Sequence, residues 1–197
     1  MTLRIERWIV WLVLAASAGT AASAQWWFGF GGQYIQPMKS EFDARNTGAP
    51  GLSFAMTGQH TCCWWYGVEL DYSPLKRRDS AAANLQNFDH QTQIGAHLRY
   101  FPWRPDKTPL YIAGNISITD VSIADSSAID PLPDLRNSAT GALGAKLSVG
   151  YLFLFDCYGP YFFDLHLSAN EPALLFRGKD RPRLSQFALG LRFAIRL

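Results

Sequence analysis

The stretch "HLS" at 166–168 has the residue types of a nucleophilic active site. His166 and Ser168 are two positions apart, so on an extended strand they would share a face and place a general base beside a hydroxyl nucleophile. A carboxylate from Asp164, Glu171 or Asp180 would orient the base. The stretch therefore defines a candidate hydrolase with His166, Ser168 and Asp180 as its catalytic residues.

The same stretch is similar to the His-x-Ser motif of the PagL-type lipid A deacylases, which are eight-stranded barrels. In that family an Asn directly follows the Ser, whereas here Ala169 follows and Asn170 comes one residue later. The strand alternation described below also turns His166 and Ser168 toward the inside of a barrel, where a lipid acyl chain would not reach them. A deacylase is therefore the alternative to a protein without enzymatic activity.

Charged and imidazole side chains form a second set, because they recur at alternate positions of several extended segments. A buried charge without a partner costs several kcal/mol, so we expect opposite charges on neighbouring strands to pair, with Glu69 beside His97 or Arg99. The expected lumen polar network comprises Glu69, Asp71, His97, Arg99, Lys146, Asp164, His166 and Arg192, with Asp164 or His166 beside Arg192.

Basic residues gather in two of the connections between these segments. Such clusters suit phosphate-bearing lipopolysaccharide or an acidic protein partner, and ordinary solvated surface charge explains them about equally well. The basic residues are Lys76, Arg77, Arg78, Arg177, Lys179, Arg181 and Arg183.

No spacing typical of a metal centre, a phosphate-binding glycine loop or a nucleic-acid module occurs in the chain. The stretch "GFGG" at 29–32 lies within an alternating segment, where glycines make room inside a barrel rather than bind a nucleotide. We therefore expect no cofactor, no metal and no nucleic-acid partner.

The segments that position these residues alternate apolar with polar or small side chains. In the closing stretch "QFALGLRFAIRL", Phe187, Leu189 and Leu191 share one face, while Arg192 lies on the other. A period of two predicts a strand. We place strands near 26–36, 51–58, 64–73, 88–101, 109–119, 140–154, 160–169 and 184–197.

Most of these strands have one apolar face and one polar face. A soluble sandwich or lipocalin would bury the apolar face, whereas a membrane barrel turns it toward lipid. The connections favour the membrane barrel, because they alternate long and short as in outer-membrane barrels with short periplasmic turns. The long ones are 37–50, 74–87, 120–139 and 170–183, and the short ones are 59–63, 102–108 and 155–159.

The sequence thus predicts an all-β fold: an eight-stranded antiparallel up-and-down transmembrane β-barrel. At this size side chains fill the interior, so the inward charges form a structural network rather than line a pore. Aromatic residues gather at the strand ends that border the short turns, where a girdle at the lipid headgroups is expected. The expected periplasmic girdle comprises Trp26, Trp27, Trp64, Trp65, Trp103, Phe155, Tyr158 and Tyr161.

The N-terminal residues have the features of a secretory signal. "MTLRIER" is basic, the following apolar run is too short to span a bilayer, and "ASA" at 22–24 suits a signal peptidase. We expect residues 1–24 to be a cleaved signal peptide and residues 25–197 to form one outer-membrane barrel domain. The net charge of +2 adds no strong electrostatic preference for a partner.

Over residues 25–197 the chain resembles the small outer-membrane barrels of the OmpX and OmpA membrane-domain type. "GLRFAIRL" is similar to the C-terminal signal read by the barrel-assembly machinery, although that signal usually ends in an aromatic residue and this chain ends in Leu197. "PLPD" at 131–134 and "LLFRGKD" at 174–180 resemble, more loosely, the TraO family of conjugative-transfer proteins.

These resemblances imply a bacterial outer-membrane location and contact with outer-membrane lipids and lipopolysaccharide. They also imply a non-enzymatic protein that acts through its extracellular loops or within an envelope assembly, conjugative transfer being one such assembly.

Three cysteines, Cys62, Cys63 and Cys157, fall in the first and third short turns. The predicted topology places all three on the oxidising periplasmic side. Adjacent cysteines rarely bridge each other, because neighbouring Cα atoms are about 3.8 Å apart. A bridge from Cys157 to one of the others and three free thiols both remain open.

Overall fold

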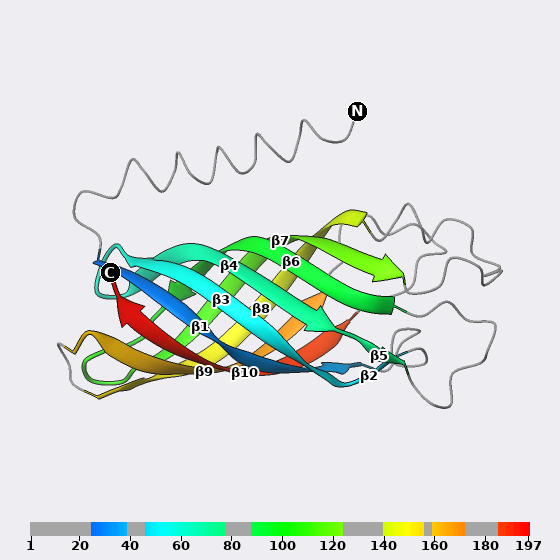
Figure 1. Ribbon diagram of the computed structural model, residues 1–197. Coiled ribbons are helices and arrows are strands. Elements are labelled where there is room, and N and C mark those ends of the chain that lie inside the picture. The colour runs from blue at the N-terminus through cyan, green and yellow to red at the C-terminus, as the bar shows by residue number, and fades with distance from the viewer. Residues whose placement is uncertain (1–24, 39–45, 78–87, 124–139, 156–158, 172–184) are drawn as a thin grey trace.

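The structure is a computed structural model that describes residues 25–38, 46–77, 88–123, 140–155, 159–171 and 185–197. Eight strands close into an antiparallel barrel, in which β1 pairs with both β3 and β10 (Figure 1). These strands are β1 (Gln25–Pro37), β3 (Ala49–Gln59), β4 (Trp64–Pro74), β6 (Phe88–Tyr100), β7 (Leu110–Ile123), β8 (Thr140–Leu154), β9 (Tyr161–Glu171) and β10 (Gln186–Arg196). The predicted strands and the predicted all-β barrel are confirmed.

Two further strands, β2 (Asn46–Thr47) and β5 (Lys76–Arg77), form a small separate sheet at the end of the barrel opposite the C-terminus (Figure 1). Asn46 pairs with Arg77, and Thr47 pairs with Lys76. Both segments lie in connections that the sequence predicts to be long, because two-residue strands are too short to show alternation. The sheet links the β1–β3 connection to the β4–β6 connection.

Closure of the barrel leaves none of its eight described strands with an unpaired edge. Phe30 of β1 lies opposite Phe193 of β10 on one side and Phe54 of β3 on the other. At the end of β10 the Leu197 amide donates to the Trp26 carbonyl at 2.9 Å. A wall closed in this way satisfies the backbone hydrogen bonds within itself, as hydrocarbon surroundings require.

The barrel is apolar outside and polar inside. Large hydrophobic side chains point outward on every long strand, with exposed fractions of 48% for Phe30, 64% for Ile116 and 55% for Leu167. Charged residues such as Glu69 and Arg192 are buried in the interior. A soluble protein would show the reverse distribution. Among the described residues, no helix is both long enough and apolar enough to cross a membrane.

One end of the interior is closed by a layer of apolar and aromatic side chains, which we call the aromatic layer. The indole rings of Trp27 and Trp65 are parallel with centroids 6.4 Å apart, and the ring of Phe162 lies 4.9 Å from that of Trp27. The layer comprises Trp27, Trp65, Phe101, Tyr111, Ala113, Leu152, Phe162 and Ala194.

The aromatic layer corrects the expectation that Trp27 and Trp65 belong to an outer girdle. Each follows another tryptophan, and alternation along a strand allows only one residue of such a pair to face outward. Trp64 is the outward member of its pair, and Trp26 is only partly buried. Trp103, Phe155 and Tyr161 are also exposed, whereas Tyr158 lies outside the described residues.

Candidate functional site

The charged interior begins directly above the aromatic layer, around Asp164 of β9. Its carboxylate accepts a hydrogen bond from the Tyr111 hydroxyl at 2.6 Å and pairs with Arg99 Nη2 at 3.0 Å. Arg192 of β10 approaches the same carboxylate at 3.9 Å. All four side chains are buried. Tyr111 therefore belongs both to the aromatic layer and to the polar network, and it joins the two.

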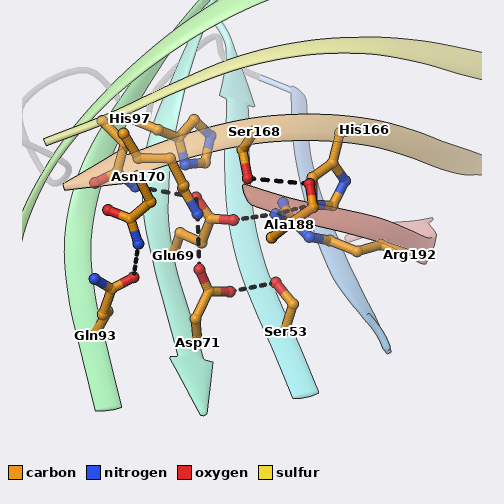
Figure 2. A network of polar contacts seen from close by, with 12 residues as sticks. Ser53, Glu69, Asp71, Gln93, His97, His166, Ser168, Asn170, Ala188 and Arg192 are labelled. Carbon is orange, nitrogen blue, oxygen red and sulfur yellow. Dashed lines mark hydrogen bonds and ion pairs between the residues drawn. The ribbon is translucent and has the colours of Figure 1, made fainter. Parts of the chain in front are cut away.

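A second centre lies around Lys146 of β8, between two carboxylates of β4. Its ammonium group is 2.9 Å from Glu69 and 2.7 Å from Asp71. Glu69 also accepts hydrogen bonds from Asn115 and Arg192. Arg192 thus connects the Lys146 centre to the Asp164 centre. Figure 2 shows Glu69 and Arg192 facing each other in this network. Side chains from β4, β6, β8, β9 and β10 meet inside the barrel.

The charges of the network balance. Arg99, Lys146 and Arg192 supply three cations, and Glu69, Asp71 and Asp164 supply three anions. Each of these groups lies within ion-pair distance of an opposite charge, which offsets much of the cost of removing it from water.

The two buried histidines bond to neighbours within this network. His97 Nε2 lies 3.1 Å from the Thr57 hydroxyl, and His166 Nε2 lies 3.1 Å from Arg192 Nη2. Since a guanidinium group can only donate, the bond to Arg192 requires Nε2 of His166 to accept. His166 is therefore held as a hydrogen-bond acceptor for Arg192.

The predicted lumen residues are all buried, but part of the predicted pairing is wrong. Glu69 contacts Arg192 and Lys146 rather than Arg99, whose partner is Asp164. The predicted pairs join residues of neighbouring strands only. In a barrel of eight strands the lumen is narrow enough for long side chains to span it, so partners come from opposite walls.

Glycines provide the space that these side chains occupy. A Cβ on Gly190 would lie 2.4 Å from His166 Nε2, and a Cβ on Gly150 would lie 2.3 Å from the Tyr111 ring. Gly190 is the strand partner of His166, and Gly150 is the strand partner of Tyr111. The ring in each case lies over the backbone of the adjacent strand.

A group of neutral polar residues, which the sequence argument did not single out, continues the network. Asn170 donates to Gln93 at 2.7 Å, and Gln93 donates to the Thr119 hydroxyl at 3.0 Å. Ser53 donates to Asp71 at 2.6 Å. Strand parity indicated that these positions face inward, but their neutral side chains gave no reason to select them.

The geometry at His166 and Ser168 is not that of a base and a nucleophile. Both residues are 2% exposed. The Ser168 hydroxyl donates to the Ala188 carbonyl at 3.4 Å, while His166 Nε2 bonds to Arg192 (Figure 2). The Ser168 hydroxyl therefore has a backbone partner. His166 Nε2, which would have to act as the base, already accepts a hydrogen bond from Arg192. Asp180 lies outside the described residues.

Of the predicted basic loop residues, the structure describes two. Lys76 and Arg77 form β5, and the Lys76 side chain is exposed. Arg78, Arg177, Lys179, Arg181 and Arg183 lie outside the described residues.

The β3–β4 turn carries the adjacent thiols Cys62 and Cys63. They are unbridged, with their sulfur atoms 3.3 Å apart. Cys157 lies outside the described residues. Within the part of the chain that the structure describes, no cluster of three or more His, Cys, Asp or Glu residues has metal-binding geometry.

The closed eight-stranded wall, its apolar exterior and its ionic interior are the fold of a small outer-membrane β-barrel. Solved structures that share the fold include the following two. Neisserial surface protein A has a TM-score of 0.57 at 13% identity, covering 86% of this chain and 96% of that one. The outer membrane protein OprG from Pseudomonas aeruginosa has a TM-score of 0.56 at 11% identity, covering 88% and 96%.

The Yersinia pestis outer membrane protein Ail is also similar, with a TM-score of 0.47 at 11% identity, covering 89% of this chain and 100% of that one. No protein-family model matches the chain, and no curated protein sequence matches it.

Proposed function

We propose that the protein is a non-enzymatic component of the bacterial outer membrane, whose ionic interior is a structural core. The observation that carries this proposal is the inversion of polarity: exposed apolar side chains surround a barrel in which three buried cations face three buried anions. Such a surface is stable in lipid and would aggregate in water.

A structural core is favoured over an ion or proton pathway because the charges already neutralise one another. Lys146 and Arg192 each contact two carboxylates, so neither is available to a passing ion without the loss of a buried pair. The aromatic layer lies at one end of this column and fills the lumen with rings. A permeant ion would have to displace both.

Because the interior is closed, the protein acts through its surfaces outside the membrane. The strand ends joined by the long connections (β1 to β3, β4 to β6, β7 to β8 and β9 to β10) all lie at one end of the barrel, which we assign to the cell exterior. Basic residues in two of them suit lipopolysaccharide phosphates or an acidic envelope partner. Participation in an envelope assembly, such as one for conjugative transfer, is compatible with this arrangement.

Membrane fractionation and gel mobility test the proposal. The protein should fractionate with the outer membrane, and in detergent the unheated form should migrate differently from the heated form, because a closed barrel resists unfolding until it is heated. Recovery in the soluble periplasmic fraction would contradict the membrane assignment.

Lipid A analysis tests the non-enzymatic assignment. Mass spectrometry should give the same lipid A from cells with and without the protein. His166→Ala and Ser168→Ala should change stability only, by about 1–3 kcal/mol where a buried partner is lost. An acyl chain that is missing in the presence of the protein and returns with Ser168→Ala would establish the deacylase instead.

A further inference from the structure

The outer wall of the barrel carries a groove of about 770 Å³ that crosses β6, β7, β8 and β9, which we call the wall groove. Each of these strands contributes one small outward residue to it. These small residues are Ala96, Gly114, Ala145 and Ala169. They follow one another diagonally from strand to strand, because two neighbouring rows of strand partners alternate large with small side chains.

Strand register explains the depth of the wall groove at its middle. Gly114 pairs with Leu98 on one side and with Leu147 on the other, whereas Ile116 pairs with two alanines. A Cβ on Gly114 would meet no atom within 4 Å. The large side chains therefore project beyond their neighbours, and Ile116 and Leu147 are 64% and 61% exposed. They form ridges on both sides of a floor of small residues.

The wall groove opens to the outside of the barrel and not to the lumen. Inward residues also border it, and each of them bonds to a partner inside the lumen, so that it adds only main chain to the groove floor. These inward residues are His97, Asn115, Lys146 and Asn170. The surface that the groove presents is almost entirely apolar and faces the hydrocarbon of the membrane.

The two ends of the wall groove lie at different depths. One end reaches Ser185 and Glu171, the last residue of β9, at the barrel end with the long connections. The other end stops at Tyr66, two residues inside the start of β4, toward the opposite end. The groove therefore crosses the wall obliquely, as the tilt of the strands in Figure 1 requires.

This oblique course covers the depth of one lipid leaflet. The strands β4, β6, β7, β8, β9 and β10 are neighbours in that order. Strand spacings of about 4.8 Å, summed from β4 to β10 at a tilt of about 35–45°, give a descent of about 15 Å. The hydrocarbon core of a bilayer is about 30 Å thick, so one leaflet accounts for about half of it.

We propose that the wall groove holds one acyl chain of a membrane lipid, with the lipid head group at the Glu171 end. That end is polar, since the Ser185 hydroxyl donates to the Glu171 carboxylate, and it lies where the strands end. Lipid tails are as apolar as the wall, so van der Waals contact with the two ridges, not removal from water, favours the bound chain. A flexible chain can follow a diagonal floor one residue wide, whereas the convex wall of a second barrel would rest on the ridges.

Photo-cross-linking in lipid vesicles tests the proposal. The probes are two phosphatidylethanolamines with a diazirine near the head end or near the methyl end of one chain, each a minor component of phosphatidylcholine vesicles. Mass spectrometry of the peptides locates the cross-links. The head-end probe should label the wall near Ala169 and Glu171, and the methyl-end probe should label it near Leu98 and Tyr66.

Two outward glycines provide a matched pair of variants. Gly114→Ile fills the floor of the wall groove and should lower labelling of the groove about threefold or more, as the loss of several close carbon contacts would. Gly32→Ile is the control, because Gly32 is also exposed, lies outside the groove and leaves a Cβ 3.8 Å from its nearest neighbour. It should leave labelling unchanged. The difference in gel mobility between heated and unheated samples verifies that both variants fold.

The proposal rests on the membrane location proposed above, but not on which end of the barrel faces the cell exterior, because the chain enters from the Glu171 end in either orientation. It is overturned if folded protein is labelled evenly around the wall, if the two probes label the opposite ends, or if Gly114→Ile is labelled like the native chain. Cross-links between two copies through the groove would assign it to a second barrel instead. Failure to insert into vesicles would overturn the membrane location together with the groove.

Discussion

Arg99 of β6 and Asp164 of β9 form an ion pair of 3.0 Å across the lumen, although β7 and β8 separate their strands in the barrel wall. Both side chains are buried. The pair therefore ties together two parts of the wall that share no backbone hydrogen bonds. Its removal is expected to weaken the whole barrel rather than one strand pairing.

Arg99→Met should lower the free energy of unfolding by about 3–5 kcal/mol, because it leaves the Asp164 carboxylate buried without its nearest cation. Urea unfolding of the protein in lipid vesicles, followed by tryptophan fluorescence, measures the change. The matched control is Arg99→Met with Asp164→Asn, which removes both charges and keeps a polar partner for Tyr111. The double variant should recover much of the lost free energy of unfolding. If its loss equals the sum of the losses for Arg99→Met and Asp164→Asn alone, the two residues do not form a direct pair.

Gly150→Ala should lower the free energy of unfolding by about 1–3 kcal/mol, because the added methyl group would overlap the Tyr111 ring and displace it from Asp164. Gly114→Ala is the matched control on a neighbouring strand, since a Cβ there meets no atom within 4 Å. It should change stability by less than about 0.5 kcal/mol. Equal losses of stability at the two positions would mean that the effect comes from replacing any strand glycine and not from overlap with the Tyr111 ring.

The fold was predictable because alternation is a local property. The residue pattern of each strand predicts which of its side chains face outward. The alternation of long and short connections predicts which end of the barrel faces the periplasm. The inward position of Trp27 and Trp65 also follows from alternation, since adjacent residues of a strand cannot share a face. The gathering of aromatic residues at one end of the barrel does not distinguish the two members of each tryptophan pair.

The cross-lumen contacts were not predictable in the same way. Whether Glu69 meets Arg99 or Arg192 depends on the stagger of the strands at closure and on the reach of the side chains across the lumen. Neither the stagger of the strands nor the reach of the side chains can be read from the residue pattern of a single strand.

In planar bilayers the protein should produce no stable large conductance. The aromatic layer fills the lumen at one end, and the ion pairs occupy the space beyond it. Single-channel recording of the detergent-folded protein, with a porin as positive control, measures this. Reproducible current steps of porin size would show that the interior opens.

The thiol of Cys63 should react more readily when Cys62 is absent. Its hydrogen bond to the Cys62 thiol raises the pKa of Cys63, with partial desolvation as a second cause. A raised pKa leaves less thiolate, the reactive form, at any pH below it. Cys62→Ala, compared with the native pair when Cys157 is replaced by Ser in both, should move the pH profile of Cys63 alkylation to lower pH. An unchanged profile would show that the two sulfur atoms do not interact in solution.

The orientation of the barrel gives the last prediction. The β3–β4 turn with Cys62 and Cys63 lies at the end of the barrel that carries the C-terminus, and the sheet of β2 and β5 lies at the other end (Figure 1). Outer-membrane barrels have both chain ends on the periplasmic side. A membrane-impermeant thiol reagent applied to intact, reduced cells should therefore miss both cysteines and label them once the outer membrane is permeabilised. Lys76→Cys, at an exposed position of β5, is the matched control and should be labelled on intact cells. Labelling of Cys62 on sealed cells, with Lys76→Cys protected, would mean that the two ends of the barrel are exchanged and that the basic connections face the periplasm.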